Sequence, residues 1–200
     1  MPSGRLHDRI TLWSLPLIAG GTFGLTRNSD FTLLTTGGFL FSGLMFGPDL
    51  DIHSRHFIRW GWLRLLWVPY QKTIRHRSVW SHGLIVGTLL RVVYLSFWIS
   101  LFTGLGAACA YWVWGVQVDW GHWGGLTMEG VYNYRGQVFA LWLGLELGAI
   151  SHVAADTIGS QITRYRRQRL PKKGITKKSS KNSLPIPRKL PPRNPKKTKR

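Results

Sequence analysis

Long uncharged segments alternate with short charged connections along the chain, and their lengths predict membrane-spanning helices. Residues 10–26 and 31–48 carry no charge and lie near the lower limit of a bilayer span, which takes about 20 residues. Residues 92–118 form a longer uncharged run than a soluble core helix needs. A fourth apolar segment, residues 136–163, contains ionisable side chains, which are rare inside a span and usually functional. The pattern favours an all-α protein, a polytopic membrane helical bundle of about four apolar helices.

Residues 164–200 differ from the rest in composition and predict a separate C-terminal tail. They hold 16 of the 27 Lys and Arg residues, several prolines and no Asp or Glu. Residues 1–163 keep 11 basic and 8 acidic residues, a net charge of only +3, so the pI of 11.1 reflects the tail. Such a tail lacks the apolar area that offsets the entropy of ordering. We therefore expect a membrane-embedded helical domain over residues 1–163 and a disordered tail over residues 164–200.

The basic residues are divided unevenly between the two sides that four spans would create. They cluster before residue 10, between residues 55 and 77, and in the tail, whereas the other side receives only Arg27 and Arg135. An excess of positive charge marks the cytoplasmic side of a membrane protein. The opposite side holds four tryptophans between residues 112 and 123, as an interfacial aromatic belt would. We expect an integral protein of a bacterial inner membrane, or of a thylakoid membrane, with its tail in the cytoplasm.

The cytoplasmic loop contains one strongly apolar segment, FIRWGWLRLLWVPY, residues 57–70. Helical spacing places Trp60, Leu63 and Trp67 near one face, which predicts an interfacial helix that ends at Pro69. The alternative is a lid that packs over the bundle, and the sequence does not separate the two.

Seven side chains that can bind a metal stand at the ends of apolar segments on the predicted cytoplasmic side. They are His7, Asp49, Asp51, His76, His82, His152 and Asp156. In SHVAADT, His152 and Asp156 are four residues apart, so they share one face of a helix and can bind one cation. The alternative for this pair is mutual neutralisation inside the bundle, because buried charges need partners.

Two carboxylates follow the second apolar segment, and two histidines precede the third. Asp49 and Asp51 lie in GPDLD, where they either cap a helix or, because like charges this close favour a cation, bind a metal. His76 and His82 bracket HRSVWSH, and although loop histidines are commonly idle, these two fall on the side of the carboxylates. His7 has the weakest local support. Three more histidines are available, the last of them on the opposite side: His53, His56 and His122.

The order of these elements, H…PDLD…HRSxxSH…SHxxxDT, resembles a known family. It is similar to the bacterial membrane proteins grouped as uncharacterised metal-binding proteins and, more distantly, to the YdjM-like membrane-bound metal-dependent hydrolases. The resemblance covers roughly residues 1–163 and rests on PSGRLHDRITLWSLP, FGPDLDIHSR, RHRSVWSHG and SHVAADTIGS. It implies that the same seven side chains form the metal site.

The ligand types limit the metal and its chemistry. The chain has a single cysteine, Cys109, so any metal is held by nitrogen and oxygen. Such a set suits Zn²⁺, with Mn²⁺ or Fe²⁺ as alternatives, better than Ca²⁺, and seven ligands exceed the needs of one tetrahedral ion, so one or two divalent ions are expected. Two ions would lower the pKa of a water molecule and hold a phosphoester between them. Arg75 or Arg77 would then neutralise a phosphate, unless these arginines serve only as membrane anchors.

Two classes of function follow. The first is a metal-dependent hydrolase that acts on a phosphoester or lipid at the cytoplasmic membrane face. The second is a non-catalytic membrane protein with a structural metal or ion-pair cluster. In both, the basic tail contacts the bilayer through anionic lipid headgroups. Nucleic acid is a poor partner because the tail has no aromatic residue after Tyr165 on which bases could stack.

Overall fold

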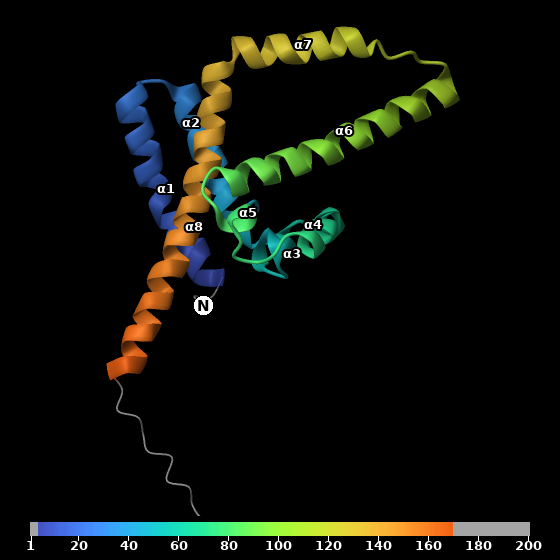
Figure 1. The fold of residues 1–200 in the computed structure, drawn as a ribbon. Coiled ribbons are helices and arrows are strands. Elements are labelled where there is room, and N and C mark those ends of the chain that lie inside the picture. Colours follow the sequence, from blue (N-terminus) through green and yellow to red (C-terminus); the bar gives the residue numbers. More distant parts are fainter. Residues whose placement is uncertain (1–3, 170–200) are drawn as a thin grey trace, which may run out of the picture.

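The computed structural model describes residues 4–169, and within that range its secondary structure is helical, with no strand (Figure 1). The prediction of an all-α protein is therefore confirmed. In chain order the elements are α1 (Gly4–Thr26), α2 (Ser29–Leu44), the 3-10 helix η1 (Pro48–Asp51), α3 (Arg55–Arg59), the 3-10 helix η2 (Gly61–Trp67), α4 (Val68–Thr73), α5 (Val79–His82), α6 (Val86–Trp114), α7 (Trp120–Asn133) and α8 (Arg135–Arg169).

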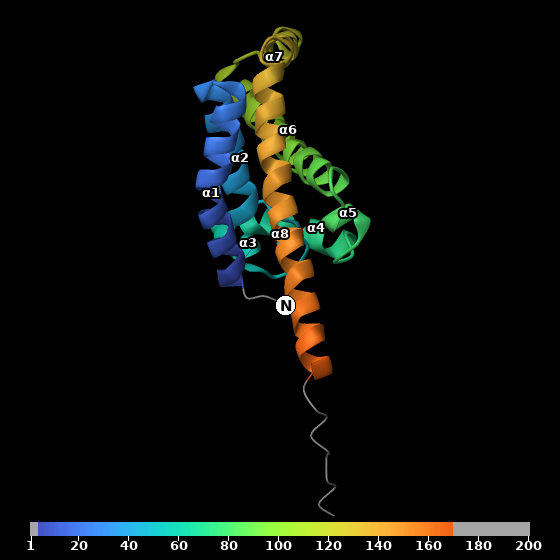
Figure 2. The ribbon, with the colours of Figure 1, turned by 90° about the vertical axis from the view of Figure 1, so that its left-hand side faces the viewer.

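Helices α1, α2 and α8 run side by side and form the bundle, as Figure 2 shows. A tight turn joins α1 to α2: Arg27 adopts a φ of 49°, and the side chain of Asn28 accepts hydrogen bonds from the amides of Asp30 and Phe31 at 2.8 and 3.0 Å. Such an N-cap satisfies amides that the first helical turn leaves without partners. The start of α1, the end of α2 and the lower half of α8 thereby come to the same end of the bundle.

Glycines let α2 and α8 approach each other backbone to backbone. A Cβ atom at Gly144 would overlap the carbonyl oxygen of Thr35, and one at Gly148 would lie 2.6 Å from Cβ of Ser42. The Thr35 hydroxyl also donates to the carbonyl of Ala140 at 3.0 Å. Small residues four apart are the common device by which helices pack closely in membranes. This contact brings the end of α2 against the middle of α8.

The segment of residues 57–70 folds as a lid and not as one helix. It is divided between α3, η2 and the start of α4, and Pro69 lies in the first turn of α4, so the prediction of a single helix ending at Pro69 is wrong. Trp67 is fully buried, and its ring packs edge-on against those of Phe46 and Tyr70 at centroid distances of 5.7 and 5.6 Å. The tryptophan that was expected to face the membrane is instead the centre of the apolar core.

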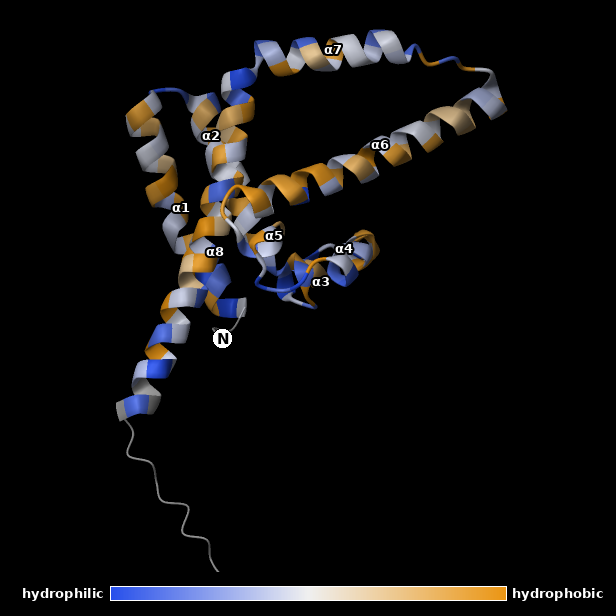
Figure 3. Ribbon diagram, in the orientation of Figure 1, coloured by the Kyte–Doolittle hydropathy of each residue, from blue (hydrophilic) through white to orange (hydrophobic). Residues whose placement is uncertain are grey.

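Helix α6 leaves the bundle after α5 (Figure 1). Ile85, the residue before it, has a φ of 66° and a ψ of −61°, and Val86 donates back to the carbonyl of Leu84 at 2.7 Å, which is a strained γ-turn for a β-branched residue. The amide of Ile85 donates to Glu146 Oε1 of α8 at 2.7 Å. From there α6 runs obliquely outward, and α7 returns across the far end to α8, while apolar residues line α6 (Figure 3).

Three helical segments, where about four were expected, are long and apolar enough to cross a membrane by length and composition: Ser29–Asp51, Val86–Trp114 and Arg135–Tyr165. Helix α1 is not among them, although it is 23 residues long. Helix α8 continues to Arg169, past the predicted start of the tail at residue 164. The rest of the predicted disordered tail, residues 170–200, lies outside the described residues.

Candidate metal centre

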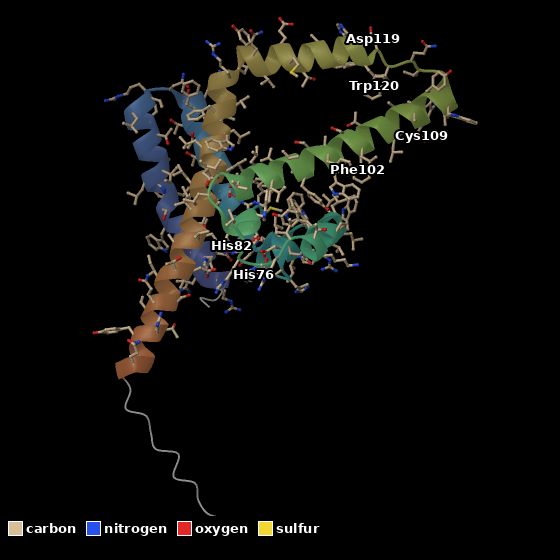
Figure 4. All side chains as sticks on the ribbon, in the orientation of Figure 1. His76, His82, Phe102, Cys109, Asp119 and Trp120 are labelled. Carbon is tan, nitrogen blue, oxygen red and sulfur yellow. The ribbon has the colours of Figure 1, made fainter. Side chains whose placement is uncertain are left out.

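The seven predicted ligands meet at the lower end of the bundle, beside the lid. His7 comes from α1, Asp49 and Asp51 from η1, and His152 and Asp156 from α8. Figure 4 labels the other two, His76, which precedes α5, and His82, the last residue of α5. Three groups offer ligand atoms that all lie within 4.8 Å of one another, namely His7, His152 and Asp156; Asp49, His56 and His152; and Asp49, His76 and His82. Asp51 stands outside these groups.

The first group is the most enclosed. His7, His152 and Asp156 are 5%, 4% and 9% exposed. Nε2 of His7 lies 3.2 Å from Oδ1 of Asp156, and the rings of His7 and His152 stack at a centroid distance of 4.1 Å. Burial, with the neighbouring His152, lowers the pKa of His7. At neutral pH its imidazole is therefore uncharged and keeps a lone pair for a metal.

Asp49 lies between the groups because it belongs to η1. This short helix begins at Pro48, after Gly47, shortly beyond the end of α2. Oδ2 of Asp49 lies 3.2 Å from Nε2 of His152, and its Oδ1 lies 3.7 Å from Nε2 of His82. The Asp49 carboxylate thus directs one oxygen towards His152 and the other towards His82. Asp49 could therefore contribute one oxygen to a cation on each side.

The remaining histidines are held in place by polar neighbours. Nδ1 of His76 lies 2.8 Å from Oδ1 of Asp51, whose side chain is fully buried. Nδ1 of His82 lies 2.8 Å from the hydroxyl of Ser81. The Nε2 atoms of both histidines are buried and have no hydrogen-bond partner among the described residues. Each ring is oriented through Nδ1 and leaves Nε2 free, as metal-binding histidines commonly are.

Two residues of this region lie outside the predicted ligand set: His56, which the sequence offered only as an available histidine, and Asp8. His56 of α3 is 4% exposed and belongs to the second group. Burial and the nearby His152 lower the pKa of His56 to about 4, so this ring is also neutral near pH 7. Asp8, next to His7, is held at 2.7 Å by both Arg55 and Arg59 of α3, which ties the start of α1 to the lid.

Asp8 is an anchor rather than a ligand. Burial opposes its ionisation, but the hydrogen bonds and charge of Arg59, with the charge of Arg55, outweigh this effect and hold the pKa of Asp8 below its usual value. Its oxygens accept from guanidinium groups and are not free for a cation. The residue has no signal in sequence, since its two partners lie far along the chain.

Residues 2–166 match the family described as "Uncharacterized metal-binding protein (DUF2227)". The chain belongs to this family. An uncharacterized protein of Aquifex aeolicus is 39% identical over 59 residues, a match that covers 29% of this chain and 41% of that protein, so the chain spans less than half the length of this relative. No solved structure matches the chain. The distant likeness to the YdjM-like hydrolases stays a prediction.

The side chains of the centre fit the metal that the family description implies. Buried ring nitrogens and carboxylate oxygens without hydrogen-bond partners are concentrated here, among them Nε2 of His76, His82 and His152, Oδ1 of Asp49 and Oδ2 of Asp51. Leaving such groups buried without partners costs about 1–3 kcal/mol each. A divalent cation would satisfy several of them at once, and nitrogen with carboxylate oxygen suits Zn²⁺, Mn²⁺ or Fe²⁺.

The two predicted phosphate-binding arginines lie in different places. Nη2 of Arg77 is 4.0 Å from Oδ2 of Asp156, and Arg77 lines a cavity of about 330 Å³ together with His82 and Asp156. Arg75 is exposed and contributes its backbone carbonyl, 3.4 Å from the Ser81 hydroxyl. A second cavity, of about 130 Å³, lies against His7 and Asp49. The structure therefore brings Arg77 to the centre.

Proposed function

We propose that the chain is an integral membrane protein that binds two divalent cations at its cytoplasmic face and hydrolyses a phosphoester, with a membrane lipid as the substrate class. The observation that carries the proposal is Asp49, whose two oxygens face separate groups of histidines at 3.2 and 3.7 Å. One ion would be held by His7, His152 and Asp156, and the other by His76 and His82. Zn²⁺ is the preferred metal, with Mn²⁺ or Fe²⁺ as alternatives.

The protein side chains have separate tasks in this proposal. Two bound cations lower the pKa of a water molecule and neutralise charge on a phosphoester. Arg77, half-exposed beside Asp156, is placed to bind a phosphate oxygen from the cavity side. Asp51 and Ser81 hold the rings of His76 and His82 in orientation. The lid packs against η1, which carries Asp49 and Asp51, and so supports the position of both carboxylates.

The membrane location is supported by the exposed apolar surface. None of the most apolar stretch of α6 is buried within the protein, so in water it would expose a long hydrophobic helix. Exposed apolar side chains continue from α6 into α5 and the short connection between the two helices, including Val79, Trp80 and Leu84. The positive charges of the loop and tail favour the cytoplasmic side for this end. A lipid phosphate would reach Arg77 at that level.

The contacts within the cluster also favour a second candidate, a structural ion-pair network without catalysis. Nε2 of His7 lies 3.2 Å from Asp156 and Nε2 of His152 lies 3.2 Å from Asp49, so each carboxylate already has a histidine beside it. This candidate predicts that the cluster retains no stoichiometric cation.

Metal analysis of the purified full chain distinguishes the two. We expect about two equivalents of metal in the wild type, and loss of at least one equivalent in both His152→Ala and Asp49→Ala. His122→Ala, at the opposite end of the molecule, is the matched control and should keep full content. Wild-type protein that holds no metal after reconstitution with Zn²⁺ or Mn²⁺ would leave the ion-pair network as the function of the cluster.

Hydrolysis is tested with metal-loaded protein in lipid–detergent micelles. We expect phosphate or headgroup release from a phospholipid, and loss of that release in Arg77→Ala with unchanged metal content. If metal-loaded protein hydrolyses neither phosphatidic acid, phosphatidylglycerol nor a soluble phosphodiester, the hydrolase function is excluded. The metal site would not be affected by that result.

A further inference from the structure

His56 occupies a position that no motif assigned. It lies in the single turn of α3, which begins where the side chain of Ser54 accepts from the amide of Phe57. The Ser54 hydroxyl donates to the backbone carbonyl of Asp49 at 2.7 Å. The backbone of η1 and the start of α3 are thus fixed to each other, so His56 and Asp49 keep a constant relative position.

The tautomer of His56 follows from its hydrogen bond. Nε2 of His56 lies 3.0 Å from the carbonyl oxygen of Gly43, at the end of α2. A carbonyl can only accept, so Nε2 carries the hydrogen and Nδ1 of the neutral ring keeps its lone pair. Histidines that bind metals characteristically donate their other N–H to a backbone carbonyl or carboxylate in this way.

Nδ1 of His56 is buried and has no hydrogen-bond partner among the described residues. Burial removes the water that would hydrate this nitrogen, and the lost hydration costs free energy unless a proton donor or a cation contacts the atom. The ring of His152 lies 5.0 Å away between centroids, and ligand atoms of His56, His152 and Asp49 fall within 4.8 Å of one another. The His56 ring therefore stands beside the other donors of a cation that His152 and Asp49 would share, and Nδ1 is the ring nitrogen left free for it.

The chain also makes room for this ring. A Cβ atom at Gly47 would lie 2.6 Å from Cε1 of His56 and 2.9 Å from its Nδ1. Any side chain at position 47 would push the ring away from η1, because both atoms belong to a rigid buried imidazole. The glycine that precedes Pro48 and Asp49 is thus required for close approach.

We propose that His56 is a metal ligand, through Nδ1, of the ion that His152 binds. The proposal rests on the metal centre proposed above and names a residue beyond its predicted set. With Asp49, His7 and Asp156 nearby, this ion would have the larger set of protein donors. The ion of His76 and His82 has fewer donors and lies towards the cavity of Arg77. The two positions thus divide into an enclosed ion and an accessible one.

Two variants and a neighbouring control test the role of His56. His56→Ala removes the ring, whereas His56→Gln keeps an N–H for the Gly43 carbonyl but offers no imidazole lone pair. His53→Ala removes a histidine three residues away that is exposed and packs against Phe57. Zn²⁺ affinity, the visible spectrum of the Co²⁺-loaded protein and the melting temperature of the metal-free protein are measured for each.

A ligand role predicts that His56→Gln melts near the wild type without metal, yet binds the tighter Zn²⁺ ion more than about tenfold more weakly and shows an altered Co²⁺ spectrum. His53→Ala should match the wild type in all three measurements. If His56→Gln keeps wild-type Zn²⁺ affinity and the wild-type Co²⁺ spectrum, His56 only caps the end of α2 and the inference is overturned. Wild-type protein without any bound metal would instead refute the metal centre itself.

Discussion

Asp49 and Asp51 are two residues apart and differ in their nearest partners, although His82 lies 3.7 Å from one carboxylate and 3.8 Å from the other. In a 3-10 helix with three residues per turn, side chains at i and i+2 point in directions about 120° apart. Asp49 faces His152 and His82, whereas the fully buried carboxylate of Asp51 contacts Nδ1 of His76. The PDLD motif therefore supplies one carboxylate between the two proposed ions and one that orients a histidine.

This difference predicts unequal effects of substitution. Asp51→Asn keeps the shape but weakens the contact that orients His76, so we expect Zn²⁺ affinity to fall about 10- to 100-fold at one position. Asp49→Asn should cause a larger loss and affect both ions, because its two oxygens face both groups. Isothermal titration of the metal-free variants measures the affinities, and equal losses in the two variants would contradict the separate roles.

Residue type and order were sufficient to predict most of the cluster, but not every role within it. His152 and Asp156 follow from helical spacing, and Asp49 from its place after an apolar segment. His56 and His53 look alike in sequence, and what separates them is a backbone carbonyl at Gly43, which carries no signal in residue type. Asp8 was missed for a similar reason, since its arginine partners are 47 and 51 positions away.

At the scale of elements, the crossing of α2 and α8 determines whether the ligands meet. The sequence GLELG, residues 144–148, places two glycines one turn apart on α8, and this signal was available without a structure. Asp49 follows the end of α2, and His152 lies one turn beyond Gly148. A close helix crossing therefore sets the distance between the carboxylate and the imidazole.

Substitution at this crossing should weaken both stability and metal binding. In Gly144→Ala the added methyl group would overlap the carbonyl of Thr35, so the helices must move apart, at a cost of about 1–3 kcal/mol. Gly37→Ala is the matched control, because a Cβ atom there meets nothing within 4 Å and alanine favours a helix. Thermal unfolding and Zn²⁺ affinity are measured together; a Gly144→Ala protein as stable as Gly37→Ala would show that the crossing tolerates separation.

In the lid, residues 57–70, the prediction of one helix from the spacing of apolar residues was wrong. Trp60, Leu63 and Trp67 have helical spacing, yet Gly61 adopts a φ of 58° and divides the segment. Trp67 turns inward to Phe46, and the hydroxyl of Tyr94 donates to the carbonyl of Leu66. Tertiary contacts with α6 thus outweigh the local preference for one helix, which no pattern within the loop reveals.

For the whole molecule, the orientation of α6 can be tested with the cysteine that the chain already has. Cys109 of α6 is exposed on the protein surface and is the only cysteine in the sequence. If α6 lies in the bilayer, a membrane-impermeant maleimide should label it poorly in vesicles, whereas a permeant maleimide should react. Lys72→Cys in a Cys109→Ala background, at an exposed position of α4 in the loop before α6, is the accessible control. Rapid labelling of Cys109 from the aqueous phase would contradict a buried α6.

The positions of the ligands along the chain have a consequence for biosynthesis. His7 belongs to the first helix and Asp156 to the last, and they stand 3.2 Å apart in the finished fold. A growing chain therefore leaves the ribosome with only part of this donor set until α8 has been made and docked. The proposed enclosed cation would then bind late in maturation and would stabilise complete chains over truncated ones.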